Sequence, residues 1–153
     1  MKLLLDTNIL LRMAQTASPD HFTSKSAVLK LAQAQVVLCV VPQVIYEFWV
    51  VATRPITANG LGMDVLTAER SILGIIQNYF FLKDERGIFD NWRSRVVLNS
   101  VYGKPAHDAR LIAAMARHNL SNILTFNTSD FARYSGIQVF APTEVLKGRL
   151  PVA

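Results

Sequence analysis

Residues 1–10 read MKLLLDTNIL and are the most informative segment for the fold. Three consecutive leucines at residues 3–5 predict a short buried strand, and residues 8–14 follow with the apolar spacing of a helix. Asp6 therefore stands where the strand ends. In an α/β protein, the carboxyl ends of parallel strands form the crevice in which ligands bind. The stretch thus predicts an α/β fold with an acid at the ligand-binding edge of its sheet.

The rest of the chain continues the alternation of strands and helices. Residues 36–41 are apolar and rich in valine, as expected for a strand buried on both faces, and Pro42 suits the first turn of a following helix. Further strands are predicted at residues 80–82, 123–126 and 137–140, and helices at residues 24–34, 42–54, 67–79, about 85–101, 106–119 and from residue 142. This order predicts one domain over residues 1–153, with a central, mostly parallel sheet of four or five strands flanked by helices on both faces.

Composition narrows the class of protein. The 153 residues are 51% hydrophobic and 18% charged, and the longest apolar run is far shorter than the roughly 20 residues that span a bilayer. Asp6 interrupts the apolar start, so we expect no signal peptide, and the single cysteine, Cys39, is expected as a small buried side chain. These features predict a cytoplasmic protein without a membrane segment. A net charge of +5 is compatible with a polyanionic partner, but is also ordinary for a small domain.

Two more acids fall on otherwise apolar helical faces. Glu47 lies three residues after Val44 on the predicted helix at residues 42–54, and Asp108 is followed at helical spacing by Leu111. Burying a lone carboxylate is unfavourable unless the group is paired or coordinated. Together with Asp6, these acids predict a carboxylate cluster for a divalent cation.

Each acid also has a structural explanation that the sequence leaves open. Asp6 is a good N-cap for the helix after it. Glu47 can stand at the edge of the apolar face, toward solvent or an arginine. Asp108 near a helix N-terminus is favoured by the helix dipole.

A fourth polar segment, LTFNTSDF at residues 124–131, follows another predicted strand. Asn127 or Asp130 could reach a cation or its water from there. The alternative is a helix start capped by Asn127 or Thr128.

These four segments, in this order, resemble the PIN-domain ribonucleases, and above all the VapC-like toxins of bacterial toxin–antitoxin pairs. The resemblance implies an acidic pocket that binds Mg²⁺ or Mn²⁺ and cleaves RNA, with Asp6, Glu47 and Asp108 as the metal-binding acids. Many members carry a fourth acid where this chain has Asn127, so either Asp130 replaces that acid or Asn127 holds a water in its place. The residues that match the small polar positions supporting such a site are Thr7, Asn8 and Thr125.

The resemblance also implies a cognate antitoxin as partner and a homodimer. Five basic residues are candidates for phosphate contacts: Arg86, Arg93, Arg95, Lys104 and Arg110. Because the fourth acid is missing, a second interpretation stays open, namely a catalytically inactive module of the same fold that binds RNA or a protein. A third, a phosphoryl-transfer enzyme with Asp6 as nucleophile, lacks a recognisable activating base and phosphate-binding lysine.

Overall fold

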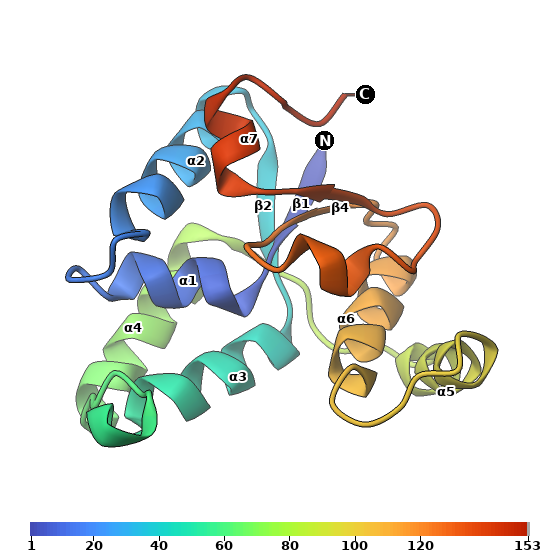
Figure 1. Ribbon diagram of the computed structural model, residues 1–153, viewed down its shortest axis with the longest axis horizontal. Coiled ribbons are helices and arrows are strands. Elements are labelled where there is room, and N and C mark those ends of the chain that lie inside the picture. Colours follow the sequence, from blue (N-terminus) through green and yellow to red (C-terminus); the bar gives the residue numbers. More distant parts are fainter. Residues whose placement is uncertain (153) are drawn as a thin grey trace.

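Five parallel strands form the centre of the computed structural model, which describes residues 1–152 (Figure 1). The strand order is β3-β2-β1-β4-β5, and every neighbouring pair is parallel. The strands are β1 (Lys2–Leu5), β2 (Val37–Val40), β3 (Phe80–Phe81), β4 (Asn122–Leu124) and β5 (Gln138–Phe140). The α/β fold and the parallel sheet expected from the sequence are confirmed.

Helices cover both faces of this sheet. They are α1 (Thr7–Ala14), α2 (His21–Gln33), α3 (Pro42–Thr53), α4 (Val65–Asn78), α5 (Ile88–Leu98), α6 (Ala106–Arg117) and α7 (Pro142–Leu146), with short 3₁₀ turns η1 (Ile56–Ala58) and η2 (Thr128–Phe131). Figure 1 shows α1, α3 and α4 to one side of the sheet and α5 and α6 to the other. This division is what right-handed crossovers require when the chain first adds strands on one side of β1 and then on the other.

The central strand β1 is enclosed by these layers. Leu3, Leu4 and Leu5 have no exposed surface, and neither has Cys39 on the neighbouring β2, as expected from the sequence. β1 lies between β2 and β4, and the chain changes direction across the sheet here. Ligands of open α/β sheets bind at such a switch point, outside the carboxyl ends of the strands. The register pairs Leu5 with Leu124, so the residues that follow β1 and β4 lie side by side.

Two helices begin three residues away from the position expected from the sequence. α2 begins at His21 rather than residue 24, because the tight turn before it is closed by hydrogen bonds from the Ser18 N–H to the Gln15 carbonyl and from the His21 N–H to the Ser18 carbonyl. α5 begins only at Ile88, after Gly87 adopts a left-handed conformation with φ of 92°. Within residues 1–152, no helix is both long and apolar enough to cross a bilayer.

Candidate active site

Asp6 lies at the switch point and is almost fully buried, with 9% of its surface exposed. Its Oδ1 accepts a 2.7 Å hydrogen bond from the Thr7 N–H, so Asp6 caps α1. The capping explanation therefore holds. It uses only one of the two carboxylate oxygens and does not exclude a second role.

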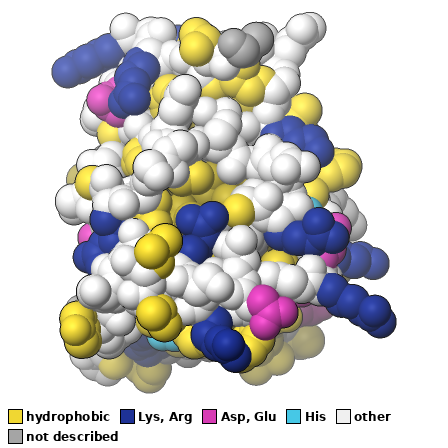
Figure 2. Space-filling view, turned by 90° about the vertical axis from the view of Figure 1, so that its right-hand side faces the viewer, with side chains coloured by type: hydrophobic (Ala, Val, Ile, Leu, Met, Phe, Trp, Pro, Cys, Tyr) yellow, Lys and Arg dark blue, Asp and Glu magenta, His cyan; other side chains and the backbone are white. Residues whose placement is uncertain are grey.

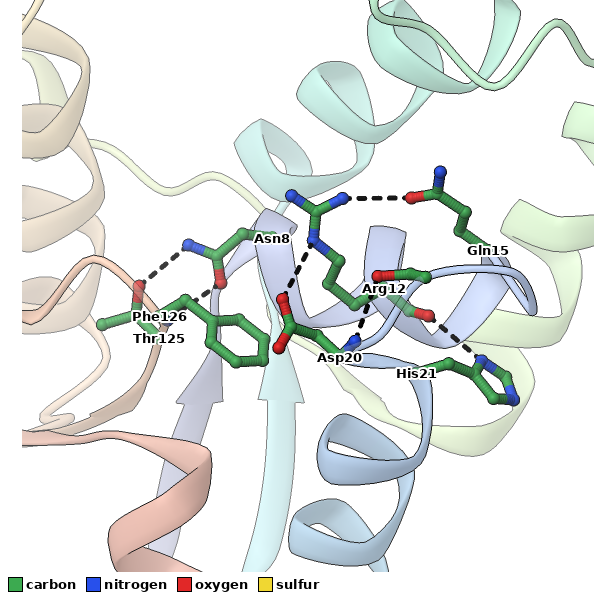
Figure 3. A network of polar contacts seen from close by, with 8 residues as sticks. Asn8, Arg12, Gln15, Asp20, His21, Thr125 and Phe126 are labelled. Atoms are coloured by element: carbon green, nitrogen blue, oxygen red, sulfur yellow. Dashed lines mark hydrogen bonds and ion pairs between the residues drawn. The ribbon is translucent and has the colours of Figure 1, made fainter.

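The other oxygen of Asp6 is held by side chains. Oδ2 accepts hydrogen bonds from Asn8 Nδ2 at 2.9 Å and from Thr125 Oγ1 at 2.6 Å. Asn8 also donates to Thr125 Oγ1 at 3.0 Å and accepts from the Phe126 N–H at 3.2 Å, and Figure 3 shows this link from α1 to the end of β4. The segments at residues 6–8 and 125–126 are thereby fixed against each other.

Glu47 reaches the same edge of the sheet from α3. Its Oε2 accepts a hydrogen bond from Thr7 Oγ1 at 3.0 Å, and its Oε1 accepts one from Gln43 Nε2 at 2.9 Å. The side chain is half-buried and lies beside the residue that Asp6 caps. Glu47 is therefore positioned by neutral donors rather than by an arginine.

Gln43 connects Glu47 to the start of α6. It is buried, donates to the His107 carbonyl at 2.8 Å as well as to Glu47, and accepts from Arg110 Nη1 at 3.2 Å. His107 precedes Asp108, so Gln43 sets the spacing between α3 and the turn of α6 that carries Asp108. No motif marked Gln43 in the sequence. Its one signal is that Gln43 and Glu47 lie four residues apart and so share a helix face.

The acids are near enough for the charge of one to shift the pKa of another. Burial raises the pKa of Asp6 to about 6, opposed by the hydrogen bonds from Thr125 and the Thr7 N–H and increased by the charges of Glu47 and Asp108. The pKa of Asp108, which is half-buried, is also raised, by burial first and then by Asp130 and Glu47. Four negative side chains therefore repel one another at this edge of the sheet.

The two candidates for the position of the fourth acid, Asn127 and Asp130, differ in their contacts with the cluster. Asn127 is exposed, its side chain forms no hydrogen bond to another described residue, and only its N–H contacts the cluster, donating to Thr125 Oγ1 at 3.0 Å. Capping of η2 by the Asn127 side chain is therefore not seen. Asp130, also exposed, raises the pKa of Asp108. Asp130 thus contributes charge to the cluster, whereas Asn127 contributes its backbone.

The donor set fits a loosely held Mg²⁺ or Mn²⁺. Among the described residues, no three His, Cys, Asp or Glu side chains lie close enough together to hold one metal ion. Mg²⁺ usually keeps several waters and takes only one or two carboxylates, with substrate phosphates as further ligands. Within residues 1–152, Oδ1 of Asp6 and both oxygens of Glu47 accept one hydrogen bond each, which leaves a lone pair on each oxygen for a cation. Such an ion would be held by at most two of Asp6, Glu47 and Asp108 at a time.

An apolar hollow of the surface lies away from these acids. A cavity of about 700 Å³ between α1, α2 and α4 is lined mainly by apolar side chains, among them Met13, Leu29 and Ile75. None of the five site residues expected from the sequence borders it. The acids therefore form a polar site that is separate from this apolar hollow.

No protein-family model and no curated protein sequence matches the chain, but solved structures do. VapC20 from Mycobacterium tuberculosis, a sarcin–ricin loop cleaving toxin, superposes with a TM-score of 0.65 at 14% identity, covering 85% of this chain and 93% of that one. The chain has a PIN-like fold. A chain of VapBC-1 from nontypeable Haemophilus influenzae gives a TM-score of 0.69 at 16% identity, with 94% and 99% covered. A chain of a toxin–antitoxin complex from Klebsiella pneumoniae gives 0.63 at 20% identity, with 92% and 97% covered. The PIN-like fold is shared over nearly the whole chain, and at these identities the likeness shows the fold alone.

Proposed function

We propose that this chain is an endoribonuclease dependent on Mg²⁺ or Mn²⁺, and the toxin of a toxin–antitoxin pair. The observation that carries the proposal is Asp6, whose buried carboxylate has its pKa raised to about 6 and faces the charges of Glu47 and Asp108 at the switch point of the sheet. A purely capping aspartate gains nothing from two like charges nearby. A cation would turn this repulsion into coordination.

Each residue of the site would have its own role in RNA cleavage. A divalent cation at the acids would lower the pKa of a bound water and offset the charge of the scissile phosphate. Asp6 would be the most rigid ligand, because Thr7, Asn8 and Thr125 fix its orientation. Glu47 from α3 or Asp108 from α6 would be the second ligand, and Gln43 would keep those helices at the right spacing.

Charge and fold support RNA as the substrate. Ten Lys or Arg residues and six Asp or Glu residues follow residue 80. Figure 2, which views the molecule from the side where α5 and α6 lie, shows Lys and Arg side chains spread over this face and few acids. A negative site within a basic surface suits a polyanion whose backbone must approach bound metal. VapC20, which shares the fold, is a toxin that cleaves the sarcin–ricin loop.

We further propose that a cognate antitoxin restrains the enzyme and that the chain forms a homodimer. Structures of the same fold from Klebsiella pneumoniae and Haemophilus influenzae come from a toxin–antitoxin complex and from VapBC-1. Co-expression with any short reading frame found next to the gene, followed by sedimentation of the purified complex, tests both partners.

The cleavage test uses total bacterial RNA with Mg²⁺ or Mn²⁺, and sequencing of the new ends. We expect cleavage at a limited set of sites, none in excess chelator, and a loss of about a hundredfold or more for Asp6→Asn and Asp108→Asn. Asp64→Asn is the matched control, because Asp64 caps α4 and is fully exposed. Full activity in excess chelator would rule out the mechanism.

A second candidate function is an inactive PIN-like module that binds RNA or protein. Two observations favour it: Asn127 is neutral, and within residues 1–152 no three potential ligands lie close enough to hold one metal. RNA binding without any new ends, at every metal concentration, would establish it.

A further inference from the structure

A second pocket, of about 480 Å³, lies between α5, α6 and the segment after β3. Its lining includes Asp84, Glu85, Phe89, Trp92, His107 and Arg110. Neither the resemblance nor the proposed chemistry uses this space. We propose that it binds one unpaired nucleobase of the RNA strand, next to the phosphate held at the acids. This inference rests on the proposed function, since it names a subsite of the same substrate.

One wall of the pocket is a fixed aromatic pair. The rings of Phe89 and Trp92 have centroids 5.8 Å apart and planes tilted by 36°. Trp92 is held in place because its indole Nε1 donates a 2.9 Å hydrogen bond to the Ala106 carbonyl, at the first residue of α6. Phe89 is 64% exposed, so much of its ring is open to a ligand. Unpaired bases stack on aromatic side chains presented in this way.

Arg110 forms the wall between the pocket and the acids. Its Nη2 lies 3.0 Å from Oδ2 of Asp84, in the pocket, and its Nη1 donates to Gln43, which in turn donates to Glu47. His107 borders the pocket and directly precedes Asp108. A nucleotide with its phosphate at the acids therefore has this pocket as the adjoining space for its base.

The polar edge of the pocket indicates which base fits. Asp84 and Glu85 present carboxylate oxygens, and these side chains are oriented by Arg110 and by Arg117, whose Nη2 lies 2.9 Å from Oε2 of Glu85. Carboxylates accept hydrogen bonds and cannot donate them. Guanine presents two adjacent N–H donors, at N1 and N2, on its Watson–Crick edge, whereas uracil presents one donor between two acceptors. The pocket is therefore expected to prefer guanine.

The test measures binding of two labelled single-stranded decaribonucleotides by fluorescence anisotropy, in chelator so that the RNA stays intact. One probe is oligouridine, and the other has a single central guanosine. We expect wild-type protein to bind the guanosine probe several-fold more tightly, and Phe89→Ala to lose about tenfold in affinity for it. Phe22→Ala is the matched control, since Phe22 is an exposed phenylalanine on α2 outside this pocket.

A second readout is the emission of Trp92. The chain has two tryptophans, so Trp49→Phe leaves Trp92 as the only reporter. Saturating guanosine probe should change this emission if a base stacks there. Unchanged emission, or equal affinity of wild type and Phe89→Ala for the RNA, would overturn the proposal. So would a Phe89→Ala variant that binds RNA normally but has lost affinity for the antitoxin, because the pocket would then belong to a protein partner.

The two proposals fail separately. If the protein binds the guanosine probe through Phe89 but cuts no RNA with metal present, the nuclease proposal fails and the base pocket stands. If RNA is cleaved and Phe89→Ala leaves the KM for it unchanged, the base pocket fails and the nuclease stands.

Discussion

Thr125 Oγ1 lies 2.6 Å from Oδ2 of Asp6, although 119 residues separate them in the sequence. The same hydroxyl accepts hydrogen bonds from Asn8 Nδ2 and from the Asn127 N–H, both at 3.0 Å. A hydroxyl has one donor and two acceptor sites, so all three are used. One side chain thereby joins the ends of β1 and β4 to the starts of α1 and η2, and orients the central acid of the site.

Thr125→Val tests this relationship, because valine keeps the shape and removes the hydroxyl. The Asn8 and Asn127 donors and Oδ2 of Asp6 would each lose a partner, so we expect the free energy of unfolding to fall by about 2–4 kcal/mol and RNA cleavage to fall about tenfold to a hundredfold. Thr125→Ser should restore both. If urea unfolding gave the same free energy of unfolding for Thr125→Val and the wild type, the hydroxyl would not contribute to stability.

The raised pKa of Asp6 predicts a pH dependence of stability in metal-free protein. Because a pKa of about 6 exceeds the ordinary value of 3.8, the folded state binds this proton more tightly than the unfolded chain. The stability contributed by Asp6 is therefore greatest at low pH and is lost as pH rises from about 4 to about 6. Relative to Asp6→Asn, the wild type should lose at most about 3 kcal/mol over this range. Urea unfolding of both proteins in chelator, at several pH values, measures the difference.

Asp64→Asn is the control of opposite sign. Hydrogen bonds from the Thr67 N–H and hydroxyl lower the pKa of Asp64 below its ordinary value. Its contribution is therefore present above the ordinary pKa and is lost as pH falls through the lowered one. If Asp6→Asn and Asp64→Asn gave stability differences with the same pH trend, the pKa of Asp6 would not be raised in the folded protein.

Gln43→Met addresses the link between α3 and α6. The substitution keeps the length of the side chain but removes its hydrogen bonds to Glu47, the His107 carbonyl and Arg110. We expect Mn²⁺ affinity and cleavage to fall about tenfold to a hundredfold, as for other outer partners of metal ligands. Gln33→Met, at the exposed end of α2, is the matched control. If calorimetric titration gave the same Mn²⁺ affinity for the two variants, Gln43 would have no part in positioning the metal ligands.

Substitutions at Asp130 and Asn127 show which of the two side chains takes part in metal binding. Asp130 raises the pKa of Asp108, whereas the neutral Asn127 side chain forms no hydrogen bond to another residue within 1–152, so we expect Asp130→Asn to weaken Mn²⁺ binding about tenfold. Asn127→Asp should change it less. Calorimetric titration measures the Mn²⁺ affinity of both variants. Tighter binding by Asn127→Asp would instead show that the missing fourth acid belongs at residue 127. If neither changes binding or cleavage, this segment is only the start of a 3₁₀ turn.

Most of the fold could be predicted from the sequence because its signals are local. The valine-rich strand before Pro42 and the three leucines before Asp6 mark two central strands, and both lie where expected. The start of α2 was misplaced by three residues, since the turn that precedes it depends on backbone hydrogen bonds rather than on apolar spacing. The start of α5 was also misplaced, because Gly87 adopts a positive φ just before the helix begins.

The site was only partly predictable because its contacts are not local. Asp6 could be placed at a strand end from its own neighbours, and the helical faces of Glu47 and Asp108 pointed to the same edge. Gln43 contacts α6 across 64 residues, which no spacing in one sequence indicates. The role of these acids in metal binding and catalysis stays a prediction.

The most direct test of the central claim is a crystal of the protein grown or soaked with Mn²⁺ and measured near the manganese absorption edge. We expect an anomalous peak about 2.0–2.6 Å from a carboxylate oxygen of Asp6 and of at least one of Glu47 and Asp108, with waters filling the other positions. An anomalous map with no peak at these residues, or with manganese bound only elsewhere, would contradict it.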